Sequence, residues 1–133
     1  MTVLRIHDLV EGRYVLAVDL HHLLDLLGTR ALHSMWEVDA VDDELMIAGE
    51  EAADELEEIA AWKGRVSGVL LSRLAHAVHQ VIWGEFRGLE EQSAQTWVII
   101  RAIDSTCYEV ETEDVSILTL VRETFKDVRE ASQ

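Results

Sequence analysis

The sequence predicts a single α+β domain, in which amphipathic helices pack on an antiparallel sheet. Residues 80–112 are dense in β-branched and aromatic residues, whereas other segments repeat apolar residues at helical spacing. The chain has 133 residues, 49% of them hydrophobic, which is enough for one ordinary core without a metal or a disulfide.

The segment 80–112 is expected to form three antiparallel strands in a meander, over residues 80–88, 96–103 and 107–112. The middle strand is apolar on both alternating faces except at Arg101. A strand of this kind is usually central in its sheet, so we expect its two neighbours on either side.

In the third strand of the meander, carboxylates alternate with the other side chains, so one face of the sheet is expected to lie in water. The inward set is Tyr108, Val110 and Thr112, and the outward set is Glu109, Glu111 and Glu113. Asp104 and Ser105 are expected in the turn before this strand, because both side chains can bond their own backbone.

The N-terminal part is expected to contain a strand over residues 2–8 and a second strand over residues 13–18, where a helix competes for residues 14–20. Asp19 is the predicted N-cap of a helix that runs to Leu27, and Gly28 is its predicted stop.

Two further strands are expected over residues 35–41 and 45–48, with Asp42 and Asp43 in the turn between them. Both could join the meander in one sheet. The apolar side chains of residues 50–62 share one arc of a helix, which predicts a helix there.

Two further helices are predicted from apolar stripes. The first covers residues 66–80, with an apolar arc near ~180° that is typical of a helix packed deeply on a sheet. The second covers residues 113–129, with Thr112 as its predicted cap.

The net charge of −15, from 26 acidic and 11 basic residues, limits the classes of partner. Nucleic acids and anionic membranes are polyanions, so neither is expected to bind. No apolar run reaches about 18 residues, so neither a membrane span nor a signal peptide is expected. With Cys107 as the single cysteine there is no internal disulfide, which fits a cytoplasmic location.

The acidic residues concentrate in residues 31–61, which hold eleven carboxylates and no Lys or Arg. Like charges three and four positions apart in a helix repel one another, and several such pairs cost about 1–2 kcal/mol. We therefore expect a docking surface for a basic protein, although a merely solvated helix face is the alternative. The predicted partner-binding residues are Asp42, Asp43, Glu44, Glu50, Glu51, Asp54, Glu55 and Glu58.

The histidines offer a weaker indication of chemistry. His76 and His79 lie on one face of the predicted helix 66–80, but a metal site needs a third ligand and Arg65 on that face opposes a cation. His21 and His22, with Asp25 one turn further on, are a weaker candidate still, because adjacent histidines diverge by about 100° on a helix and do not chelate one ion without distortion. We expect exposed histidines, and neither a metal nor another cofactor is assigned.

Three other features have structural interpretations. Cys107 is expected to be a buried structural cysteine, because no base or oxyanion donor is placed beside it. Trp83 and Phe86 are expected in the core, and a binding patch beside Gly84 is the alternative. An ion-pair network around Arg101 is expected rather than acid–base catalysis, with these carboxylates as its members: Glu85, Asp104 and Glu109.

No phosphate loop, nucleophile elbow or zinc-ribbon spacing occurs, and we expect a binding protein rather than an enzyme. The function predicted from the charge is neutralisation of a basic protein, as an immunity protein or antitoxin does for a nuclease-type toxin. One alternative is a self-associating regulatory or scaffolding module, a homodimer that buries Trp36 or Trp83. A metal-assisted enzyme that uses His76 and His79 is the other alternative.

Overall fold

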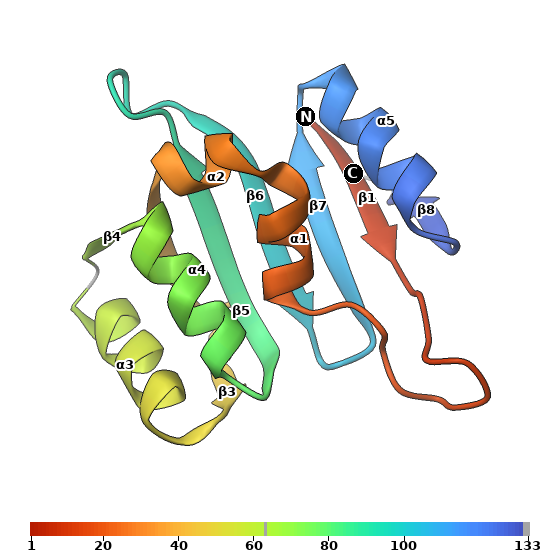
Figure 1. Cartoon of the computed structure of the whole chain (residues 1–133), viewed down its shortest axis with the longest axis horizontal. Coiled ribbons are helices and arrows are strands. Elements are labelled where there is room, and N and C mark those ends of the chain that lie inside the picture. The colour runs from red at the N-terminus through yellow and green to blue at the C-terminus, as the bar shows by residue number, and fades with distance from the viewer. Residues whose placement is uncertain (63, 132–133) are drawn as a thin grey trace.

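A computed structural model describes residues 1–62 and 64–131, which form an α+β fold of one antiparallel sheet and five helices (Figure 1). The strands are β1 Thr2–Ile6, β2 Met35–Asp39, β3 Met46–Ala48, β4 Arg65–Ser67, β5 Gln80–Leu89, β6 Thr96–Ile103, β7 Cys107–Thr112 and β8 Val128–Glu130. The helices are α1 Leu20–Leu27, α2 Thr29–His33, α3 Glu50–Ala61, α4 Gly68–Ala77 and α5 Val115–Thr124. None of these helices is long and apolar enough to cross a bilayer.

The predicted meander is confirmed and occupies the middle of the sheet. The strand order is β4-β2-β5-β6-β7-β1-β8, and β3 pairs with β5 beyond the end of β2. The strand β6 therefore lies between β5 and β7, as its apolar composition predicts. The strands β2 and β3 both extend the sheet at β5, which confirms the two strands expected before α3.

One face of the sheet carries the core. Trp36, Phe86 and Tyr108 are among the largest fully buried side chains, and they share one apolar cluster with residues from every helix. Figure 1 shows α1, α2 and α4 lying across the central strands on this face, with α5 beside β1 and β7. In the described part of the chain, no helix packs on the opposite face.

The start of α1 is tied to the sheet through Asp19. As predicted, Asp19 is the N-cap residue and Gly28 follows the last residue of the helix. The Asp19 carboxylate accepts hydrogen bonds from the Tyr108 hydroxyl at 2.6 Å and from the backbone N–H of Val81 at 3.2 Å. Burial raises the pKa of Tyr108 well above its usual value, and the neighbouring charge of Asp19 raises it further, so the hydroxyl remains a donor.

The strand predicted over residues 13–18 is wrong. This segment belongs to a protruding loop in which only Leu9 and Leu16 form an isolated bridge, and Tyr14 is fully exposed. A strand needs a neighbour that satisfies its backbone groups over several residues, and within the described chain this segment bonds only residues 8–10 of its own loop and joins no strand of the sheet.

The helix predicted over residues 66–80 is shorter at both ends. Residues 65–67 form β4 on β2, and Ser67 caps α4 by accepting from the backbone N–H of Leu70. A side chain at Gly68 would place its Cβ 1.9 Å from the carbonyl oxygen of Ala31, so glycine lets α4 begin directly against α2. After Ala77 the chain turns into β5, which removes His79 from the helix.

The last predicted helix is also too long. The cap of α5 is Asp114 rather than Thr112, since its carboxylate accepts from the backbone N–H of Ser116. The helix stops at Thr124 because the Asp8 carboxylate accepts the backbone N–H groups of Lys126 and Asp127. Residues 128–130 then pair with β1 as strand β8.

Candidate acidic docking surface

The eight predicted docking carboxylates lie on two consecutive segments, the β2–β3 turn and α3. We call these eight residues the acidic surface. Asp42 and Asp43 adopt positive φ values of 49° and 64° in the turn, a backbone conformation that Asp tolerates better than most residues. Glu44 closes the turn by pairing with Val41. All eight residues of this surface are exposed.

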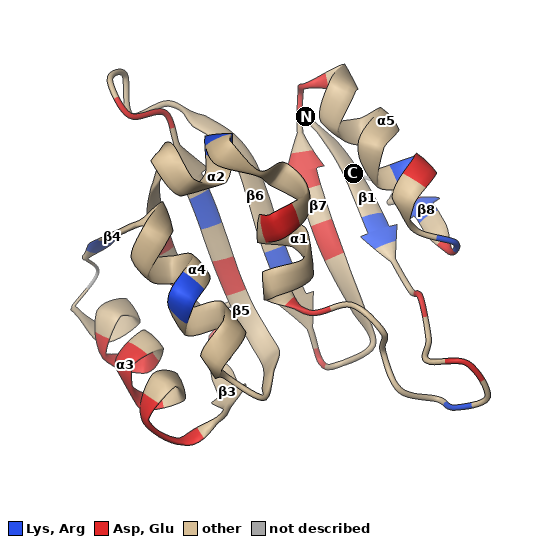
Figure 2. Cartoon of the chain, in the orientation of Figure 1, with Lys and Arg blue, Asp and Glu red and all other residues tan. Residues whose placement is uncertain are grey.

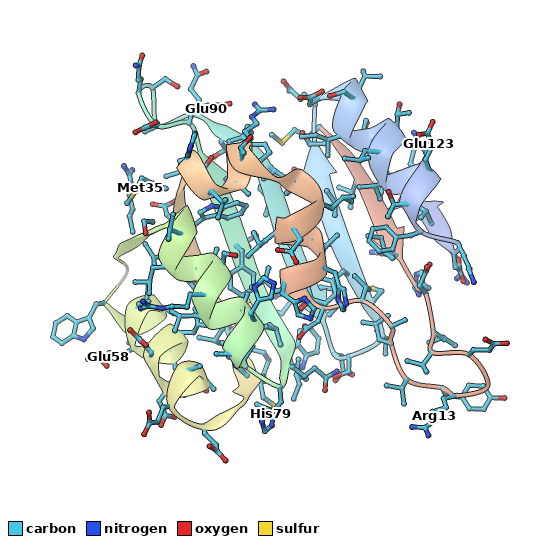
Figure 3. All side chains as sticks on the ribbon, viewed as in Figure 1. Arg13, Met35, Glu58, His79, Glu90 and Glu123 are labelled. Atoms are coloured by element: carbon cyan, nitrogen blue, oxygen red, sulfur yellow. The ribbon has the colours of Figure 1, made fainter. Side chains whose placement is uncertain are left out.

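Helix α3 presents its carboxylates outward because its apolar side chains are buried on the other side. Leu56 is fully buried and Ala53 nearly so. Asp54 and Glu55, which lie between these two residues in the sequence, therefore face the solvent. Figure 2 shows α3 with acidic segments and no basic one. In Figure 3, Glu58 points away from the body of the molecule.

An exposed tryptophan continues this acidic face. Four carboxylates of α3 and Trp62 recur at helical spacing within about 100° of arc, in the order Glu51, Asp54, Glu55, Glu58 and Trp62. The backbone N–H of Trp62 donates to the carbonyl oxygen of Glu58, so the tryptophan prolongs the last helical turn. Its side chain is 80% exposed and borders a shallow depression with Glu55, Glu58 and Arg65.

Trp62 was missed as a binding residue in the sequence, where it only ended a predicted helix. The spacing of four residues from Glu58 is the signal that could have placed it on the acidic face rather than in the core.

The carboxylates of the acidic surface are not neutralised by the chain itself. Within residues 1–62 and 64–131, none of them lies within 4.0 Å of an arginine or lysine nitrogen. The arginines that form ion pairs are directed elsewhere, and they are Arg5, Arg30, Arg65, Arg101, Arg122 and Arg129.

The predicted ion-pair network around Arg101 is present on the open face of the sheet, with one member exchanged. The Arg101 guanidinium lies 2.9 Å from Glu85, 2.9 Å from Glu111 and 3.5 Å from Glu109, and Arg5 lies 2.8 Å from Glu109. Burial alone would lower the pKa of Arg101, but the bonds to Glu111 and Glu85 outweigh it and the pKa is raised. We call these five residues the Arg101 network.

Asp104 does not belong to this network. It lies in the β6–β7 turn with φ 49°, and Glu111 takes the place expected for it. The register of β6 with β7 explains the exchange, because Glu111 faces Ile99, one step along the same side of the sheet from the Arg101–Glu109 pair.

The aromatic residues separate into core and surface. Phe86 is fully buried, as expected, and Trp83 is half-buried in the N-terminal half of β5. Trp36 is fully buried and packs edge-to-face on Trp97 with ring centroids 6.0 Å apart. A homodimer interface at Trp36 is therefore wrong, because the side chain already belongs to the core. Cys107 is buried as expected, and burial raises the pKa of its thiol.

The structure pairs the histidines differently from the sequence prediction. His79 lies beyond the end of α4, at the lower end of the molecule in Figure 3, so it does not share a helix face with His76. His76 instead faces α1, where its Nε2 lies 3.0 Å from Oδ2 of Asp25 and its ring centroid lies 4.9 Å from that of His21. This pairing of two helices was missed, because spacing along one helix carries no information about the neighbouring helix.

No family model matches the sequence, and neither a curated protein nor a solved structure matches the chain. The function is therefore argued from the geometry of the surfaces themselves.

Proposed function

We propose that this protein binds a basic protein through α3 and the β2–β3 turn, with Trp62 as the apolar anchor. The observation that supports this most directly is the exposed row of Glu51, Asp54, Glu55, Glu58 and Trp62 on one side of α3. Unpaired carboxylates attract Lys and Arg, and an exposed indole can stack on a guanidinium or fill an apolar pocket.

The uneven distribution of charge supports a partner rather than a merely soluble surface. Solubility is served by charges scattered over the whole molecule. Here the like charges recur at i,i+3 and i,i+4 along one helix, where each pair costs about 0.2–0.5 kcal/mol of helix stability. A cationic partner removes this repulsion on binding, and the field of the helix accelerates its approach.

The concrete form of the proposal is a cytoplasmic immunity protein or antitoxin that covers the active site of a nuclease-type toxin. Nuclease active sites are basic because their substrate is a polyanion. A helix with outward carboxylates imitates part of that polyanion and blocks access to it. This role requires binding alone, so the protein acts as an inhibitor and not as an enzyme.

The test measures association of the full chain with purified basic nuclease domains over a series of ionic strengths. We expect the association rate to fall at least about tenfold between ~20 mM and ~200 mM salt, as steered encounters do. An association rate that is indifferent to salt would remove the steering argument.

Variants with matched charge locate the contact. The triple substitution Asp54→Lys, Glu55→Lys and Glu58→Lys is expected to abolish binding, and Trp62→Ala is expected to raise the dissociation rate. The control is Glu11→Lys, Glu91→Lys and Glu123→Lys, which changes the net charge equally at exposed residues outside the acidic surface. Figure 3 shows Glu123 on α5, on the other side of the molecule from Glu58. If both triple variants weaken binding equally, net charge alone is responsible and α3 is not the docking face.

The homodimer alternative has less support. The strands at the two ends of the sheet, β4 and β8, have three residues each and offer little edge for pairing with a second copy.

A further inference from the structure

A cluster of two histidines and one aspartate bridges α1 and α4 and contains none of the residues used in the proposed docking. His21, Asp25 and His76 each bring one ligand atom, and the three atoms lie within 4.8 Å of one another. His21 and Asp25 are four residues apart on α1 and therefore share a face, one turn apart. His76 comes from the last turn of α4.

The hydrogen bonds of His76 orient its ring for a cation. Nδ1 lies 2.7 Å from the carbonyl oxygen of Ser72, which only accepts, so Nδ1 carries a proton. Nε2 lies 3.0 Å from a carboxylate oxygen of Asp25, which also only accepts when ionised. Two lone pairs cannot face each other at this distance without a positive charge. Nε2 must therefore hold a second proton or share a metal ion with Asp25.

This is the arrangement found around metal-bound histidines. A ligating imidazole donates its other N–H to a backbone carbonyl or a carboxylate, which fixes the tautomer and the orientation of the ring. The Ser72 carbonyl supplies that contact for His76.

His21 supplies the second nitrogen. Its ring centroid lies 4.9 Å from that of His76, and its ligand atom lies within 4.8 Å of those of Asp25 and His76. An imidazole nitrogen is a common ligand of transition-metal ions.

We propose that His21, Asp25 and His76 bind a divalent transition-metal ion of the Zn²⁺ type, with water completing the coordination. Two imidazole nitrogens and one carboxylate suit such ions, whereas Mg²⁺ and Ca²⁺ prefer sites built from oxygen. A tetrahedral Zn²⁺ holds its ligand atoms roughly 3.3 Å apart. His76 and Asp25 already meet this spacing, and His21 reaches it by a small rotation of a half-buried side chain. The site is independent of the proposed docking, because α1 and α4 contribute nothing to the acidic surface.

The test titrates Zn²⁺ into the chelator-stripped full chain by calorimetry, with Mg²⁺ titrated separately. We expect one Zn²⁺ per chain with a dissociation constant on the order of 1 μM or lower, and no measurable Mg²⁺ binding. His21→Ala, Asp25→Asn and His76→Ala should each weaken Zn²⁺ binding at least about tenfold. The matched control is His33→Ala, an exposed histidine on α2 outside the cluster, which should leave the affinity unchanged.

A second measurement uses the native sequence and does not depend on how the variants fold. Histidine ring resonances in NMR spectra should shift for His21 and His76 when Zn²⁺ is added, while those of His33 stay in place. The proposal is overturned if Zn²⁺ does not bind, if it binds without shifting His21 and His76, or if His33→Ala weakens binding as much as the three cluster variants do. In any of these cases the Asp25–His76 contact is an ordinary ion pair between two helices.

Discussion

Two groups of carboxylates on the outside of this molecule have opposite relations to the rest of the chain. In the Arg101 network, three glutamates surround one arginine, and Glu109 also bonds Arg5. On α3, six carboxylates occur within nine residues, and no arginine or lysine of the described chain forms an ion pair with those of the acidic surface. Figure 2 shows the difference as alternating basic and acidic segments on the central strands against a purely acidic helix.

The difference shows which charges serve the fold and which do not. The sheet network is half-buried, with only about 20% of the Arg101 side chain exposed, so each charge there needs a partner from within the chain. The α3 carboxylates are solvated, so folding proceeds without partners for them. Substitutions in the Arg101 network should therefore lower the free energy of unfolding of the protein, whereas neutralising substitutions on α3 should raise it.

The largest effect is expected for Arg101→Met. The substitution leaves Glu85 and Glu111 in a half-buried position without their counter-charge, which should lower the free energy of unfolding by about 3 kcal/mol. Urea denaturation measures this change. The control is Arg122→Met, which removes an exposed pair with Glu130 and should cost less than about 0.5 kcal/mol. Equal losses in the two variants would mean that the sheet network contributes no more than a surface ion pair.

The next effect concerns a carboxylate that is matched by neutral donors. Tyr108→Phe removes the hydroxyl that bonds Asp19, and we expect a loss of about 1.5–2 kcal/mol in the free energy of unfolding. Urea denaturation again measures it, with Tyr14→Phe as the exposed control that should leave stability unchanged. A neutral result at Tyr108 would indicate that solvent replaces the missing donor at the start of α1.

A smaller effect of the opposite sign is expected on α3. Neutralising Asp54, Glu55 and Glu58 to their amides removes all six like-charge pairs at i,i+3 and i,i+4 on α3 and should raise the free energy of unfolding by about 1 kcal/mol at low ionic strength. The gain should shrink as salt is added, because salt already screens the repulsion in the native protein. The amide variants of Glu11, Glu91 and Glu123 serve as controls. A loss of stability in the α3 variant would show that these carboxylates have a structural role in the free protein.

The smallest effect is a change of titration at Asp114. The bond from the Ser116 hydroxyl, followed by the Ser116 backbone N–H and Arg30, lowers the pKa of Asp114 below its usual value. A carboxyl with a lowered pKa in the folded state adds stability above its unfolded pKa, and this stability is lost as the pH falls through the folded pKa. Ser116→Ala should therefore raise the pKa of Asp114, as followed by NMR over an acid titration. An unchanged pKa would assign the shift to the backbone and Arg30 alone.

The core of the fold follows from local patterns in the sequence. Alternation along β1, β2 and β7, the apolar β6 and the amphipathic α3 all predict their elements, because each pattern has a burial period of its own. The errors lie where a distant contact decides. Val66 fits a helix or a strand equally, and only pairing with β2 makes it a strand. The end of α5 depends on the Asp8 carboxylate, more than 100 residues away in the chain.

The candidate sites likewise differ in how far the sequence alone predicts them. The acidic surface is visible in the sequence because all its members lie in one continuous segment, although its role in docking stays a prediction. The His21–Asp25–His76 cluster is only partly visible there, because His21 and Asp25 share a face of the predicted helix, whereas His76 lies 51 residues from Asp25 and the neighbouring histidines suggest other pairings. The network at Arg101 falls between these cases, since alternation shows the outward residues while only the strand register shows which of them meet.

The exposure of Trp62 has a practical consequence for spectroscopy. Trp36 and Trp97 are shielded inside the protein, and Trp83 is partly covered. Emission at the longest wavelengths and collisional quenching by acrylamide should therefore report mainly on the indole at the end of α3. The native chain thus carries an intrinsic fluorescent probe at the place where a partner is proposed to bind, without a dye or an engineered label.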